Sequence, residues 1–187
     1  MQPSQPDSGK NLFERASAIH LVVLDVDGVL TDGRIIYFND AATTELKAFN
    51  VKDGLGISLG IREGLQFGII TARESTIVLH RARELGIQHV IQKTKTKLPA
   101  LQSLIQELGL SVDQVAYIGD DLPDIPCLSF VGVQHVGLAC CPTNAVTAVK
   151  AVCQLVARSA GGHGAVREIV EFLIQSRAFY PRERGTA

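Results

Sequence analysis

The chain has 187 residues, 46% of them hydrophobic, and its 18 Lys and Arg nearly balance its 19 Asp and Glu, for a net charge of -1. This length suffices for one sizeable core but is short for two. The near-neutral charge excludes the strong net field that draws proteins to nucleic acids or anionic membranes. We therefore expect one domain with a small-molecule partner, no nucleic acid and no membrane.

The two ends of the chain differ from its middle. Residues 1–10 are rich in Pro, Ser, Gln and Gly and contain no apolar segment of the signal-peptide kind. We expect residues 1–18 to be a disordered lead-in, 19–180 to form the single domain, and 181–187 to be a flexible tail. No apolar stretch is long enough for a membrane span, and the cysteines show no C-x-x-C spacing. These features predict a cytoplasmic protein with reduced thiols.

Apolar runs of strand length alternate along the chain with segments of helical spacing. Strands are predicted at residues 19–26, 66–71, 88–92, 115–119 and 131–134. Helices are predicted at residues 54–63, 74–85, 97–108 and 123–130. This alternation predicts an α/β fold with a doubly wound parallel sheet, in which ligands bind beyond the carboxyl ends of the strands.

One segment interrupts the alternation. Residues 34–38 and 45–50 are strand-like and flank a turn at 39–42, which predicts a β-hairpin that projects just after the first strand. Its apolar residues would leave an exposed edge unless another subunit covers them. A subunit partner is therefore expected at the hairpin.

Two carboxylates, Asp25 and Asp27, stand at the end of the first predicted strand, and Gly28 permits a turn that brings both to one site. One carboxylate can attack phosphorus while the other transfers protons in both half-reactions. The alternative is an ordinary strand-to-loop transition in which the acids cap a neighbouring helix. The pair alone leaves both interpretations open.

A second acidic group follows another predicted strand and contains Asp120, Asp121 and Asp124. Carboxylates from two strand ends at one sheet edge need a cation, and hard oxygen ligands in an open site suit Mg²⁺. The alternative for Asp121 and Asp124 is a helix N-cap. We therefore expect a magnesium site, with these two residues in supporting roles.

Thr71, after the second main strand, and Lys97, at a helix start, supply a hydroxyl and an ammonium. Such donors stabilise a transferring phosphoryl group. Taken singly, Thr71 reads as a helix cap and Lys97 as part of a solvated basic run. Their order between the two acidic groups favours the phosphate-binding interpretation.

These four segments together resemble the haloacid dehalogenase superfamily. Further stretches, at residues 32–33, 45–50, 52–54 and 161–168, are similar to its capless branch that contains 3-deoxy-D-manno-octulosonate 8-phosphate phosphatase. The likeness spans residues 19–175. It implies a Rossmann-like core with no cap domain, a Mg²⁺-dependent sugar phosphatase of lipopolysaccharide inner-core biosynthesis, and a homotetramer built through the 34–50 hairpin.

Carried over by position, the resemblance makes Asp25 the nucleophile and a metal ligand, and Asp27 the acid/base whose carbonyl oxygen also binds the metal. It makes Asp120 the second carboxylate ligand of the metal, and it implies that Thr71 and Lys97 bind the phosphate. The residues that it implies around the substrate are Asn50, Lys52, Asp53, Gly54, Arg73 and Arg81.

Some positions depart from that family's pattern: Ala72 replaces a Gly, Lys52 an Arg, and Ser58 and His163 stand where Arg occurs. None touches the nucleophile, acid or metal ligands. Two alternatives stay open. One is a phosphatase of a nine-carbon keto-sugar acid 9-phosphate; the other is a non-catalytic tetrameric interaction module.

Overall fold

The computed structural model describes residues 10–38 and 44–179. Its helices are α1 Leu12–Ser17, α2 Val51–Arg62, α3 Thr76–Leu85, α4 Lys97–Glu107, α5 Ile125–Leu128, α6 Thr147–Lys150 and α7 Ala165–Phe179. Its strands are β1 Leu21–Leu24, β2 Ile36–Phe38, β3 Thr44–Leu46, β4 Gln66–Ile70, β5 His89–Ile91, β6 Val115–Ile118, β7 Leu138–Cys141 and β8 Leu155–Val156.

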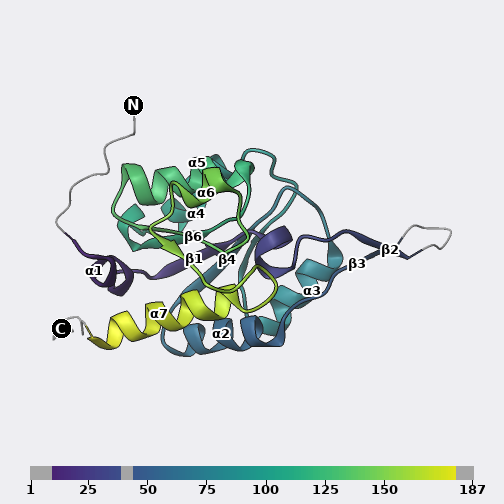
Figure 1. Cartoon of the computed structure of the whole chain (residues 1–187), viewed down its shortest axis with the longest axis horizontal. Coiled ribbons are helices and arrows are strands. Elements are labelled where there is room, and N and C mark those ends of the chain that lie inside the picture. The colour runs from purple at the N-terminus through teal and green to yellow at the C-terminus, as the bar shows by residue number, and fades with distance from the viewer. Residues whose placement is uncertain (1–9, 39–43, 180–187) are drawn as a thin grey trace.

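The six main strands form one parallel sheet in the order β5-β4-β1-β6-β7-β8. Helices α2, α3 and α7 cover one face, and α4, α5 and α6 cover the other (Figure 1). Alternate residues of β1 serve the two layers: Val22 and Leu24 pack toward the first, Leu21 and Val23 toward the second. Burial on both faces explains the continuous apolar runs in the sequence. The predicted doubly wound fold is confirmed.

A two-stranded antiparallel hairpin, β2 with β3, projects from the body of the domain (Figure 1). The predicted hairpin is confirmed, although its second strand ends at Leu46 and not at Asn50. The turn predicted at 39–42 lies outside the described residues. Within residues 10–38 and 44–179 the elements form one six-stranded sheet with its helices and the small hairpin, without a second folded unit.

The predicted strand at residues 131–134 is wrong. These residues continue α5 as a helical turn, Ser129–Gln134, and the strand comes later, at β7 Leu138–Cys141. A short buried apolar run has the same hydrophobic pattern in a helix and in a strand. The real strand was missed because its Ala and two Cys residues lack the β-branched character typical of strands.

The predicted lead-in is also wrong for residues 12–17, which form α1. Asn11 and Glu14 make a reciprocal capping box at its start, with N–O distances of 3.0 and 2.9 Å. Arg15 of this helix is buried and donates to the carbonyl oxygens of Gly132 and Gly137. Helix α1 therefore ties the turn before β7 to the domain. Residues 1–9 and 181–187 lie outside the described part of the chain.

Candidate active site at the carboxyl edge of the sheet

The predicted carboxylates meet at one edge of the sheet. Asp25 directly follows β1 and Asp120 follows β6, and these are neighbouring parallel strands with Leu24 opposite Ile118. The Asp25 amide donates to the Ile118 carbonyl oxygen at 3.0 Å, which continues the ladder into the site. Oxygens of Asp25, Asp120 and Asp124 all lie within 4.8 Å of one another.

Gly28 allows the loop after β1 to approach Asp120. Its φ is +93°, and a Cβ built there would lie 2.0 Å from Oδ2 of Asp120. Any side chain would therefore displace Asp120, in addition to straining the backbone. The Asp-x-Asp-Gly motif thus serves the geometry of both acidic segments.

Lys97 is the cation inside the cluster. Its ammonium lies 2.9 Å from Oδ1 of Asp25 and 2.8 Å from Oδ1 of Asp124, and its side chain is 4% exposed. Asp124 also accepts hydrogen bonds from the Tyr117 hydroxyl at 2.8 Å and the Asp120 amide at 3.1 Å. Asp124 is therefore a buried anchor that fixes Lys97 beside Asp25. Asp121 takes the alternative role noted from sequence and caps the turn that follows it.

The cluster carries more negative than positive charge. Burial, followed by the nearby Asp124 carboxylate, raises the pKa of Asp25 to about 6 against the opposing effect of Lys97. Burial, then Asp25 and Asp124, raises the pKa of Asp120 to about 7. Among the described residues Asp120 Oδ1 is buried without a hydrogen-bond partner. Three carboxylates, one ammonium and a free oxygen fit a hard divalent cation such as Mg²⁺.

We expect Asp120→Asn to stabilise the metal-free protein at pH 8 and to abolish its stabilisation by Mg²⁺. Because the folded-state pKa of Asp120 is raised, the folded chain binds more protons than the unfolded chain between about pH 4 and 7. The stability of the metal-free wild type therefore falls as the pH rises through this window. Removing the charge should raise the melting temperature by about 2–4 °C, equivalent to about 1 kcal/mol.

The measurement is thermal unfolding of both proteins in EDTA and in Mg²⁺, at pH 5 and pH 8. Asp113→Asn is the matched control, because Asp113 accepts a backbone hydrogen bond from Val136 elsewhere in the fold. An Mg²⁺ shift of wild-type size in Asp120→Asn would rule out this residue as a ligand.

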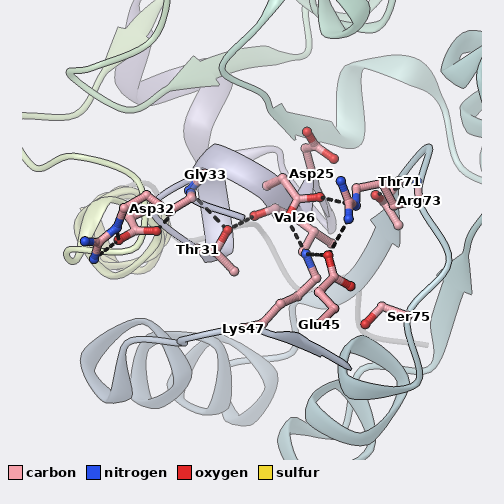
Figure 2. Close-up of polar contacts among 12 residues, drawn as sticks. Asp25, Val26, Thr31, Asp32, Gly33, Glu45, Lys47, Thr71, Arg73 and Ser75 are labelled. Atoms are coloured by element: carbon pink, nitrogen blue, oxygen red, sulfur yellow. Dashed lines mark hydrogen bonds and ion pairs between the residues drawn. The ribbon is translucent and has the colours of Figure 1, made fainter. Parts of the chain in front are cut away.

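The hairpin brings two further charges to the site. Lys47, which follows β3, lies 2.5 Å from Oδ1 of Asp27, and Arg73 lies 3.7 Å from its Oδ2. Glu45 contacts both cations: Arg73 Nη2 donates to it, and Lys47 is 3.5 Å away. Figure 2 shows the Glu45 carboxylate between the Lys47 ammonium and the Arg73 guanidinium, joined to both by dashed lines.

Sequence reasoning missed Glu45 and Lys47 as site residues. Their signal was the two-residue alternation of a strand, which places both on the face opposite Leu46. Leu46 is 44% exposed, whereas the Lys47 side chain is 3% exposed. The hairpin therefore has an outward apolar side and an inward charged side.

Thr71 follows β4, next to β1 in the sheet, and is buried. Its amide donates to the Ile91 carbonyl oxygen at 3.0 Å, and its Oγ1 accepts from the Arg73 amide at 3.3 Å. Thr71 therefore combines the cap-like role considered from sequence with a place at the same strand edge as Asp25.

The residues expected around the substrate divide into two groups. Asn50 caps α2 and donates to the Gly162 carbonyl oxygen at 3.1 Å. Asp53 is 1% exposed and accepts from the amides of Gly164 and Arg167. Direct substrate contact by Asp53 is not supported, because its carboxylate is committed to the start of α7.

The other members of that set differ in exposure. Gly54 is buried, and a Cβ built there would lie 2.3 Å from Nη2 of Arg81. Arg81 lies 5.8 Å from the centre of the Phe49 ring. Lys52 is exposed and Arg73 partly exposed, so both remain accessible. The loop that contains His163 packs on the loop after β1 through a 2.9 Å hydrogen bond from the Gly162 amide to the Val29 carbonyl oxygen.

The four cysteines are free thiols. No helix among the described residues has the length and apolar character needed to cross a bilayer.

Comparison with known proteins gives one family. Residues 74–169 match the family of haloacid dehalogenase-like hydrolases. The chain is 38% identical, over 94% of its length and 89% of the relative, to 3-deoxy-D-manno-octulosonate 8-phosphate phosphatase of Escherichia coli K12. It is 40% identical to the corresponding Yersinia pestis protein, over 88% of this chain and 84% of that one.

Solved structures of similar proteins point to the same family. The Moraxella catarrhalis 3-deoxy-D-manno-octulosonate 8-phosphate phosphatase, in complex with magnesium, phosphate and KDO, superposes with a TM-score of 0.83 at 40% identity, covering 90% of this chain and 92% of that one. The cobalt-bound Haemophilus influenzae enzyme gives 0.81 at 34% identity, covering 88% and 92%. The chain therefore belongs to the haloacid dehalogenase-like hydrolases, and within them to the 3-deoxy-D-manno-octulosonate 8-phosphate phosphatase family.

Proposed function

We propose that this protein hydrolyses 3-deoxy-D-manno-octulosonate 8-phosphate to the free sugar acid and phosphate, through a phosphoaspartate on Asp25. The observation that carries the proposal is the buried Asp25 carboxylate, held by Lys97 at 2.9 Å at the carboxyl edge of the sheet. Asp120 lies in the same cluster. A nucleophile and charge-stabilising groups at one point are what phosphoryl transfer requires.

In the first half-reaction an Asp25 oxygen forms a bond to phosphorus as the bond from phosphorus to the sugar oxygen breaks. The electron pair of that bond leaves on the sugar oxygen, which takes a proton from Asp27. Lys97 and Thr71 donate to the phosphoryl oxygens, whose negative charge they stabilise. The free sugar acid then departs and the phosphoryl group stays on Asp25.

In the second half-reaction a water oxygen attacks phosphorus and gives a proton to Asp27. The bond between Asp25 and phosphorus breaks, which returns the carboxylate to Asp25 and releases inorganic phosphate. Asp27 thus ends protonated, as it began, and serves as acid and then as base. Because Asp27 acts on the leaving oxygen and then on the attacking water, it must lie beside Asp25 in both half-reactions.

The metal proposed for this site is Mg²⁺, held by the carboxylates of Asp25 and Asp120 and by the backbone carbonyl oxygen of Asp27. When bound, it would offset the negative charge of the carboxylates and the phosphate. Asp124 is not proposed as a ligand, because both of its oxygens accept hydrogen bonds within the protein.

For the sugar acid, we propose that Arg73 and Arg81 recognise its anionic and hydroxyl groups, with Lys52 and Asn50 nearby. An arginine is suited to a 2-keto acid carboxylate because it can donate two parallel hydrogen bonds. The product would enter lipopolysaccharide inner-core synthesis in the cytoplasm.

The experiment that tests this function is phosphate release from a panel of sugar phosphates with and without Mg²⁺. We expect 3-deoxy-D-manno-octulosonate 8-phosphate to give the highest kcat/KM. Preference for a nine-carbon keto-sugar acid 9-phosphate would keep the chemistry and change the substrate. No release from any member would favour the non-catalytic tetrameric module.

We further propose a homotetramer built through the 34–50 hairpin. Ile35, Ile36 and Leu46 are 52%, 42% and 44% exposed, which is unusual for large apolar side chains grouped on one hairpin. Light scattering of the purified protein should give the mass of four chains. A monomer mass at micromolar concentration would contradict this assembly.

A further inference from the structure

Lys47, directly after β3, contacts the proposed acid/base. Its ammonium lies 2.5 Å from Oδ1 of Asp27, and its side chain is 3% exposed although the hairpin projects from the domain. Arg73 lies 3.7 Å from the other oxygen, Oδ2. The two oxygens of Asp27 thus face two different cations, which fixes the plane of the carboxylate.

Glu45 holds both cations in place. Its Oε1 accepts from Arg73 Nη2 and lies 3.5 Å from Lys47 Nζ. With Asp27 ionised, as it is between its two proton transfers, the two carboxylates and two cations form a closed group with no net charge. Such a group can fix an orientation without leaving the nearly buried Lys47 ammonium unpaired.

We propose that Lys47 is a positioning residue for the proton transfers of Asp27, acting in the hydrolysis proposed above, on which this inference rests. Lys47 orients Asp27 so that its proton reaches the leaving sugar oxygen and, later, so that its carboxylate faces the attacking water. Its ammonium pairs with Asp27 and Glu45, whereas Asp25 pairs with Lys97. The hairpin thereby has a role inside its own active site, separate from any role in assembly.

The effect of Lys47 should depend on the leaving group. A sugar alkoxide is a poor leaving group and needs the proton from Asp27, whereas 4-nitrophenolate is stable without one. Proton transfer by a positioned group contributes about 10²–10⁴-fold, and a misplacement of about 1 Å can cost about 10²-fold. Loss of Lys47 should therefore slow the sugar phosphate far more than 4-nitrophenyl phosphate.

The test compares kcat/KM of Lys47→Met and wild type on the sugar phosphate and on 4-nitrophenyl phosphate, both with Mg²⁺. This parameter covers only the steps up to departure of the leaving group, so hydrolysis of the phosphoaspartate does not enter. We expect a loss of about 10–100-fold on the sugar phosphate and less than about threefold on the nitrophenyl ester. Asp27→Asn provides the reference pattern, with the same selectivity and a larger loss.

A second readout follows from the base role. If Asp27 is misoriented, phosphoaspartate hydrolysis slows, and stopped-flow mixing of Lys47→Met with 4-nitrophenyl phosphate should show a burst of nitrophenolate near one equivalent per chain. Lys47→Arg should recover part of the sugar-phosphate activity. Lys150→Met, at a partly exposed lysine of α6, is the matched control and should behave as wild type.

Equal losses on the two substrates, or no loss on either, would overturn the positioning role. If Lys47→Met folds poorly, Glu45→Gln serves in its place. The Glu45→Gln change removes the carboxylate shared by Lys47 and Arg73, so it should give the same leaving-group selectivity with a smaller loss of kcat/KM on the sugar phosphate. Inactive wild-type protein would instead count against the proposed function, so the two failures are distinguishable.

Discussion

Asp25→Asn should lower phosphate release by more than about 10³-fold while the protein stays folded. The amide has the shape of the carboxylate but cannot attack phosphorus. In the wild type the Asp25 carboxylate is buried beside Asp124, which raises the pKa of Asp25 to about 6 and makes its negative charge unfavourable. Loss of the ion pair with Lys97 is therefore offset in part by loss of repulsion from Asp124.

The checks are steady-state phosphate release, near- and far-UV circular dichroism, and mass spectrometry of acid-quenched protein. Wild type should carry a mass increase of one phosphoryl group during turnover, and Asp25→Asn should not. Asp113→Asn, a conservative change outside the site, should keep wild-type turnover. Substantial activity in Asp25→Asn, or a phosphoryl group on another residue, would refute the mechanism.

Lys97→Met should destabilise the metal-free protein by about 3–5 kcal/mol, the usual cost of removing one partner of a buried ion pair. Met keeps the length of the side chain but leaves Asp25 and Asp124 without their shared ammonium, 2.9 and 2.8 Å away. The deficit should grow from pH 5 to pH 8, because protonation of Asp25 relieves it at low pH. Catalysis should also fall by about 10²–10³-fold, since a donor to the phosphoryl group is lost.

Urea unfolding of Lys97→Met and wild type in EDTA, at pH 5 and pH 8, measures the difference in their free energies of unfolding. Lys93→Met is the matched control: Lys93 pairs with Glu74 at 2.7 Å, but both side chains are more than 60% exposed, at 67% and 61%. Such a surface pair contributes about 0–1 kcal/mol. Equal destabilisation by the two substitutions would show that burial of Lys97 does not account for its contribution to the free energy of unfolding.

The sequence predicted the sheet and the placing of Asp25, Thr71 and Asp120 because these depend on local pattern. A buried parallel strand reads as a continuous apolar run, and its carboxyl end is where the polar residues begin. The same local reasoning failed at residues 131–134, where a buried helical turn has the hydrophobic pattern of a strand. It also overlooked the capping box at Asn11 and Glu14, which was visible in the sequence.

What the sequence determined by itself was the alternation of strands and helices from β1 to β6 and the polar residues that follow β1, β4 and β6. Only the tertiary structure decided which partners those residues have. Lys47 reaches Asp27 across 20 positions, Lys97 reaches Asp124 across 27, and Asp53 reaches Gly164 across 111. No periodicity encodes such pairs, because packing of whole elements brings them together. That packing made Asp53 an anchor of α7 and turned one face of the hairpin toward the active site.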